Sequence, residues 1–100
     1  MNSARSDANR RAIRQTLNDL LSLLEKHSVG YGAILRDIAS RLDAGGELSA
    51  DNVHQLLGGM GSLTDVYISR RNGHTVDDEG AANRKLDRLR AKLRERLSDR

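Results

Sequence analysis

The stretch AIRQTLNDLLSLLEKH, Ala12 to His27, decides the fold class because it has the pattern of an amphipathic helix. Its apolar residues recur at spacings of three and four, which places them on one face of a helix with 3.6 residues per turn. Ser6 or Asp7 can cap this helix, so we predict that it runs from one of these residues to His27. The apolar stripe consists of Ile13, Leu17, Leu20, Leu21 and Leu24.

Three further segments are predicted to be helical, and they make the chain an all-α protein. The second helix is expected from Tyr31 to Asp43, the short third over residues 49–57, and the long last one over residues 79–97. The expected architecture is a compact bundle of about four helices in a single domain of residues 1–100. Two helices are long, at the N- and C-termini, two are short, and an irregular glycine-rich segment precedes the last one.

The composition supports this class and excludes several others. Leu occurs fifteen times, Pro, Phe and Trp are absent, and β-branched and aromatic residues are too few for a sheet protein. The lack of Cys excludes disulfides, thiolate metal sites and cysteine nucleophiles. No apolar run approaches the ~20 residues that span a bilayer, and the N-terminus has no secretory apolar region. We therefore expect a cytoplasmic protein with no membrane partner.

Charge is distributed unevenly along the chain. The net charge is +3, but Arg84 to Arg100 contains eight Lys or Arg and three Asp or Glu, a local balance of +5. A basic helix at this end of the chain can be a solvated helix face, with cations favoured near a helix C-terminus. It can also contact nucleic acid, so a small basic nucleic-acid-associated protein remains an alternative function.

The glycine-rich stretch QLLGGMGSLTDVYISRRNG, Gln55 to Gly73, does not match a nucleotide-binding loop. A P-loop needs Gly-Lys-Ser/Thr, and Gly61 is followed by Ser62 and Leu63. A helix-turn-helix register also fits poorly, because none of the three clustered glycines has a buried aliphatic residue six positions later.

The same stretch is explained by a sharp turn. Three glycines, Gly58, Gly59 and Gly61, allow close approach of the backbone to another helix, and Met60 can fill the irregular gap beneath them. Ser62 and Asp65 form a possible capping pair for one further helical turn over residues 63–68. The local alternative is a short hairpin within residues 66–76, since Asn72-Gly73 is a type I′ turn signal.

No catalytic or metal-binding constellation is readable. His27, His54 and His74 lie far apart and in no zinc-ligand pattern. The acidic run Asp77 to Glu79 lacks the spacing of a calcium loop and is explained by the positive N-terminus of the last helix. We expect neither a cofactor nor an enzyme activity.

The motif GGMGSLTD, Gly58 to Asp65, together with Asn83 and the later LDRLRAKL, resembles a family of small uncharacterised bacterial proteins. That family carries a GGMGS-x-x-D signature between an N-terminal helical half and a C-terminal helix, and the resemblance covers roughly Leu17 to Leu93. It implies no assigned enzyme activity. Small helical proteins of this kind are often antitoxins or immunity proteins, which occlude a site on another protein.

The leading hypothesis is accordingly a non-catalytic protein-binding module, an immunity- or antitoxin-type or regulatory inhibitor. Its expected partner is another protein, such as a toxin or an enzyme, and a second copy of the chain is a further candidate. Aromatic and arginine side chains dominate interface energies, and they follow the glycine motif directly. The candidate partner-binding residues are Leu63, Asp65, Tyr67, Arg70 and Arg71.

Overall fold

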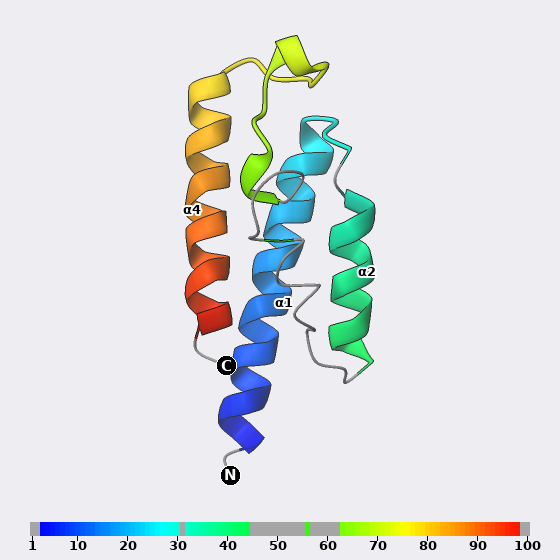
Figure 1. The fold of residues 1–100 in the computed structure, drawn as a ribbon, viewed down its shortest axis with the longest axis vertical. Helices are drawn as coiled ribbons and strands as arrows, with labels where there is room; N and C mark the ends of the chain where they lie inside the picture. Colours follow the sequence, from blue (N-terminus) through cyan, green and yellow to red (C-terminus); the bar gives the residue numbers. More distant parts are fainter. Residues whose placement is uncertain (1–2, 31, 45–55, 57–62, 99–100) are drawn as a thin grey trace.

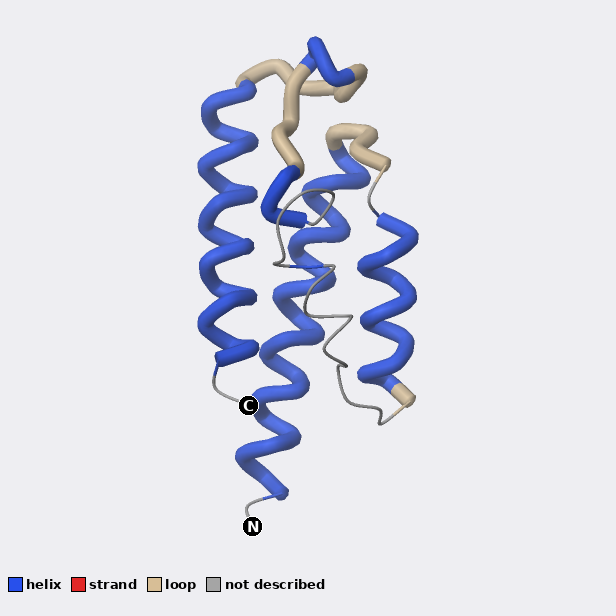
Figure 2. Tube along the Cα trace, in the orientation of Figure 1, coloured by secondary structure: helices blue, strands red, loops and turns tan. Residues whose placement is uncertain are grey.

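The computed structural model describes residues 3–30, 32–44, 56 and 63–98, and these form an all-α fold without strands. Three α-helices make up most of it: α1 (Ser3–Lys26), α2 (Gly32–Asp43) and α4 (Glu79–Ser98). Two short 3₁₀-helices, η1 (Leu63–Asp65) and η2 (Arg70–Asn72), lie before α4. α1 runs through the middle of the molecule, with α4 along one side and α2 along the other (Figures 1 and 2).

α1 confirms the predicted first helix and begins a few residues earlier, because residues 3–5 contain no Pro or Gly that would stop it. It ends in a Schellman motif, in which Val29 N–H donates to Leu24 O (2.8 Å) and Ser28 N–H donates to Glu25 O (3.1 Å). Ser28 is left-handed at φ 58, a conformation in which glycine is the usual residue. Val29 and Leu24 are both buried, which supplies the apolar contact of this motif.

α2 has almost the predicted bounds and turns its apolar face to α1. Its far end is joined to α1 by an ion pair, in which Arg14 Nε lies 2.9 Å from Asp43 Oδ1. This hydrogen bond from Arg14 lowers the pKa of Asp43. A second ion pair, between Arg36 and Glu25, joins the two helices near the other end.

α4 begins and ends close to its predicted bounds. Asp78 is its N-cap residue, because its Oδ1 accepts from Ala81 N–H at 2.9 Å. α4 lies antiparallel to α1, so that the N-terminal half of α1 is beside the C-terminal half of α4 (Figure 1).

The apolar stripes predicted from periodicity form the core, although Leu21 and Leu89 are only partly buried. The polar Thr16 is also fully buried, and its hydroxyl donates to Ala12 O at 2.9 Å. The largest fully buried apolar side chains come from all parts of the described chain: Leu17, Leu20, Leu24, Leu35, Ile38, Leu56, Leu63, Ile68, Leu86 and Leu93.

Two predictions about the connecting region have different outcomes. The hairpin alternative for residues 66–76 is wrong, because Arg70 to Asn72 form η2 and Gly73 ends it at φ 85 in the left-handed region. The predicted third helix over residues 49–57 lies outside the described residues, apart from the buried Leu56. The count of four helices therefore stays a prediction.

Candidate functional site

The candidate site is the irregular segment before α4, which we divide into an inner segment, residues 63–68, and an outer loop, residues 69–74. The inner segment runs alongside α4 and α1, and the outer loop lies beyond the N-terminal end of α4 (Figure 1). Leu63 and Ile68 bury their side chains completely and fix the two ends of the inner segment to the core. Since neither part pairs with a strand, side chains must satisfy much of the backbone.

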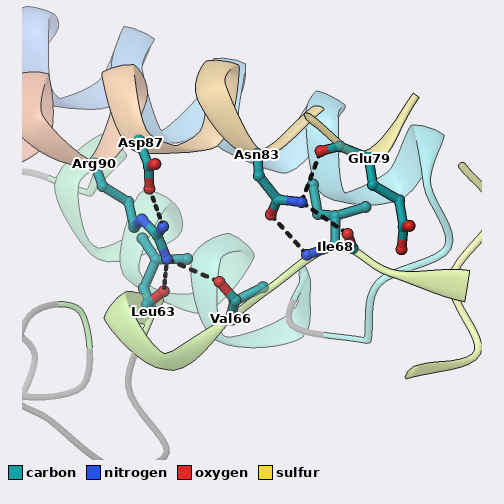
Figure 3. Close-up of polar contacts among 7 residues, drawn as sticks. All are labelled: Leu63, Val66, Ile68, Glu79, Asn83, Asp87 and Arg90. Carbon is teal, nitrogen blue, oxygen red and sulfur yellow. Dashed lines mark hydrogen bonds and ion pairs between the residues drawn. The ribbon is translucent and has the colours of Figure 1, made fainter. Parts of the chain in front are cut away.

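Asn83, on the core face of α4, holds the end of the inner segment. Its Oδ1 accepts from Ile68 N–H, and its Nδ2 donates to Ile68 O, both at 2.8 Å (Figure 3). The same Nδ2 also donates to Glu79 O at 2.8 Å. Asn83 is 7% exposed. Inside the core its amide pairs with both backbone groups of Ile68, as the backbone of a neighbouring strand would.

Arg90, two turns further along α4, holds the start of the inner segment. Its Nη1 donates to Leu63 O at 3.0 Å and to Val66 O at 2.9 Å (Figure 3). Asp87 Oδ1 forms an ion pair with Nη2 of the same guanidinium. The guanidinium of Arg90 is therefore the donor for Val66 O and a second donor for Leu63 O, which also accepts from Val66 N–H at 3.2 Å within η1.

Glu79, the first residue of α4, holds the outer loop. Its Oε1 accepts from Arg70 N–H at 3.2 Å, and its carboxylate also accepts from the Ser69 hydroxyl. The Ser69 hydrogen bond, followed by the Arg70 N–H and the charges of Arg70 and Arg71, lowers the pKa of Glu79, while desolvation opposes the shift.

His74, the last residue of the outer loop, joins the two ends of the loop to each other. Ser69 N–H donates to His74 Nδ1 at 3.1 Å, so this nitrogen carries no proton and the imidazole is neutral with its hydrogen on Nε2. Within the loop, Ser69 Oγ accepts from Arg71 N–H at 3.1 Å and caps η2. Asn72 Nδ2 donates to Tyr67 O at 3.1 Å, which ties the outer loop to the inner segment.

His27 connects the end of α1 to the chain just beyond the outer loop. Thr75 N–H donates to His27 O at 2.9 Å, and His27 Nδ1 lies 2.7 Å from Thr75 O. Because a carbonyl oxygen only accepts, His27 Nδ1 carries the proton. Nδ1 of His27 therefore donates a hydrogen bond, whereas Nδ1 of His74 accepts one.

The structure exposes four of the five candidate partner-binding residues and corrects the fifth. Tyr67 is 57% exposed and is, among the described residues, the only large apolar side chain left on the surface. Asp65, Arg70 and Arg71 are also exposed. Leu63 is fully buried, because η1 turns it into the core beside α4, and it cannot contact a partner.

A shallow, open groove of ≈ 300 Å³ lies beside Tyr67. One wall comes from Val29 and Gly30, directly after α1, and the other from Tyr67, Asn72 and His74. The exposed tyrosine therefore stands at the edge of a depression rather than on a flat surface.

Gly58, Gly59, Met60, Gly61 and Ser62 lie outside the described residues, so the sharp turn stays a prediction. In the described ranges, no three His, Asp or Glu side chains come together as metal ligands. None of the described helices is both long and apolar enough to cross a bilayer.

Asn83, Arg90, Glu79 and His74 were not identified as functional from the sequence, although one signal was present. Asn83 and Arg90 occupy the apolar stripe of α4 at i and i+7, the same face as Leu86 and Leu93. A polar residue on such a face must find a buried partner.

The fold and the site define a small all-α domain whose last helix binds an irregular segment through side chains. The chain belongs to a family of domains of unknown function (DUF6966), whose model matches residues 25–77. No curated protein and no solved structure matches the chain. The matched range contains α2, the inner segment and the outer loop, and it ends before the residues of α4 that hold them.

Proposed function

We propose that this chain is a non-catalytic protein-binding module of a bacterial cytoplasm, an immunity- or antitoxin-type or regulatory inhibitor that occludes a site on another protein. The observation that carries the proposal is Tyr67, which is exposed while the backbone on both sides of it is held by side chains of α4. The proposed contact surface consists of Asp65, Tyr67, Arg70 and Arg71.

The fixed backbone around Tyr67 favours binding of a partner. A tyrosine has few rotatable bonds and a large contact area, and Tyr and Arg are enriched among residues that dominate interface energies. Binding costs less when the backbone that presents such a side chain is already fixed. Ile68 is fixed by Asn83 and Tyr67 O accepts from Asn72, so little ordering remains to be done when a partner binds.

The glycine motif fits this proposal as the element that directs the chain toward the surface. Gly58 to Ser62, the GGMGS part of the signature, directly precedes the inner segment in the sequence. A sharp turn there would set the direction in which η1 and the contact surface leave the bundle. This part of the proposal rests on the sequence motif alone.

The test is capture of a partner from nuclease-treated lysate of the native organism, followed by affinity measurements with purified partner. Tyr67→Ala is expected to weaken binding by about 2 kcal/mol, roughly thirtyfold, as a central anchor would. Arg84→Ala removes an exposed cation of α4 and is the matched control, with no expected change. If Tyr67→Ala, Asp65→Ala and Arg70→Ala all leave the affinity unchanged, the proposed surface is wrong.

Association of two copies of the chain is the nearest alternative, and it is separated by sedimentation of the purified protein alone. A concentration-dependent dimer that Tyr67→Ala dissociates would identify the second copy as the partner. A monomer that binds the captured protein would support the inhibitor proposal.

A second candidate function is weak nucleic-acid association through α4. Its support is the row of exposed cations Arg84, Lys85, Arg88 and Lys92, which form no ion pair with the described residues. Such binding would be independent of sequence and would weaken steeply with salt, because its energy comes from counterion release. Arg88→Ala would reduce it and Tyr67→Ala would not, which is the reverse of the pattern expected for the protein-binding surface.

A further inference from the structure

The two parts of the candidate site are held by chemically different groups. The inner segment is bound by an amide and a guanidinium, Asn83 and Arg90, and neither changes its charge in the ordinary pH range. The outer loop is tied to α4 by the Glu79 carboxylate and closed on itself by the neutral His74 imidazole, and both groups act as acceptors. Protonation removes or weakens an acceptor, so acid acts directly on the bonds of the outer loop, whereas in the inner segment it reaches only the Asp87 carboxylate that pairs with Arg90.

We propose that the outer loop is a pH-dependent element: protonation of His74 opens the loop from within, protonation of Glu79 then detaches it from α4, and the inner segment stays bound to α4 throughout. Only the effect on partner binding rests on the proposed function, and the opening of the loop does not. Arg70 and Arg71 belong to the outer loop and would lose their fixed positions, so partner affinity would fall in acid.

The first step follows from the hydrogen bond between Ser69 N–H and His74 Nδ1. An imidazolium carries protons on both nitrogens and has no lone pair left to accept. Protonation would bring a second hydrogen against the Ser69 N–H, and the ring would have to move away. Histidine is the side chain whose charge ordinarily changes between about pH 5 and 8, so this is the step at milder acidity.

Other titratable groups lie around His74. Asp65 and Tyr67 line the groove together with it. His27 is the titratable group contributed by the end of α1. It donates from Nδ1 to Thr75 O and keeps this bond when its other nitrogen is protonated. The Thr75 connection is therefore expected to survive the first step.

The second step concerns the carboxylate at the start of α4. Glu79 accepts from the Ser69 hydroxyl and from Arg70 N–H, and the charges of Arg70 and Arg71 add to these bonds. These contacts hold the pKa of Glu79 below its ordinary value of 4.5. A depressed pKa means that the bonds are fully present above pH 4.5 and are lost as the pH falls through the lowered value.

The experiment is amide hydrogen exchange by NMR on the complete chain at about pH 7.5, about pH 5 and about pH 3. Protection factors correct for the intrinsic pH dependence of exchange. We expect protection of Ser69 N–H to fall about tenfold at the first step and protection of Arg70 N–H to fall about as much at the second. Ile68 N–H, which donates to Asn83, is the internal reference and should keep its protection.

Two conservative variants identify the responsible groups. His74→Asn places an oxygen acceptor near the position of Nδ1 that does not titrate, and it should abolish the first loss. Glu79→Gln keeps an uncharged acceptor and should abolish the second. His27→Ala is the matched histidine control and should leave both losses in place. Far-UV circular dichroism at each pH verifies that the helices persist.

The proposal is overturned if the Ser69 and Arg70 amides keep their protection in acid, or if they lose it in parallel with Ile68. It is also overturned if the losses persist in His74→Asn and Glu79→Gln. Since no partner is present in this measurement, its outcome is independent of whether Tyr67 is a binding anchor.

Discussion

The inner segment and the outer loop are neighbours in the chain and are held by the same helix, yet they differ in burial and in chemistry. Asn83 and Arg90 reach the inner segment inside the molecule, with Asn83 only 7% exposed and the Arg90 side chain 14% exposed. Glu79 and His74 are only half-buried, and the bond from Arg70 N–H to Glu79 is exposed, so that water competes for it.

The difference shows how one helix can anchor an irregular segment with two levels of stability. Loss of a buried hydrogen bond leaves polar groups without water, whereas loss of an exposed one is largely replaced by solvent. The inner segment is therefore expected to open only when the domain unfolds, and the outer loop is expected to open locally. Substitutions in the two parts should differ accordingly.

The largest effect is expected for Asn83→Ala. The substitution leaves the N–H and C=O of the fully buried Ile68 without partners. Each unsatisfied buried group costs ~1–3 kcal/mol, so the free energy of unfolding should fall by about 3 kcal/mol or more. Urea unfolding measures the loss. Lys85→Ala, at an exposed position of the same helix, should change stability by less than about 0.5 kcal/mol.

A smaller loss is expected for Arg90→Met, which keeps the apolar stem and removes the guanidinium. Val66 O loses its donor, and Leu63 O keeps only the Val66 N–H. We expect a decrease of about 1–2 kcal/mol in unfolding free energy, against almost none for the exposed neighbour Arg88→Met. An equal effect of the two variants would show that the Arg90 hydrogen bonds are energetically irrelevant.

Ser28 and Gly73 both have left-handed backbones, at φ 58 and φ 85. Substitutions at the two positions should change stability by similar amounts and in opposite directions. Ser28→Gly should raise stability by about 1 kcal/mol, because it removes the steric cost of a side chain in this conformation. Gly73→Ala should lower the stability of the outer loop by about as much. An added Cβ meets no atom within 4 Å, so the loss comes from the strained backbone conformation and not from a clash. Thermal unfolding measures the first, and exchange of the outer-loop amides measures the second.

The smallest effect is expected for Glu79→Gln, and its pH dependence is more informative than its size. The lowered pKa of Glu79 stabilises the fold above the ordinary value of 4.5, and this contribution disappears as the pH falls through the lowered value. Wild type should be more stable than Glu79→Gln near pH 7, and the two should converge as the pH falls through the lowered pKa of Glu79. A gap that stays constant with pH would mean that the carboxylate charge contributes nothing.

The helices were predictable from the sequence because burial on one face of a helix repeats with a fixed period. The stripe from Ile13 to Leu24 is sufficient to place α1, and Asp78 confirms the acidic start predicted for α4. The exposed positions of Tyr67 and Arg70 were also anticipated from residue type.

The hydrogen bonds that shape the candidate site were not predictable in the same way. Asn83 donates and accepts across fifteen residues of chain, and Arg90 reaches Leu63 across 27. No local pattern encodes such partners, and the Asn72-Gly73 dipeptide pointed to a hairpin instead. The chain forms η2 instead of a hairpin, because the Ser69 hydroxyl accepts from Arg71 N–H and so caps a helical turn.

The central position of α1 has a consequence for the order in which the chain folds. α2 follows α1 after a short connection, so their contacts close a small loop at little entropic cost. α4 reaches α1 only after residues 44–78 have been closed into a much longer loop, and non-local contacts of this kind slow folding. We therefore expect the α1–α2 pair to form first and α4 to return late. The inner segment and the outer loop would acquire their anchors only at that step, so the candidate site is expected to be the last part of the molecule to assemble.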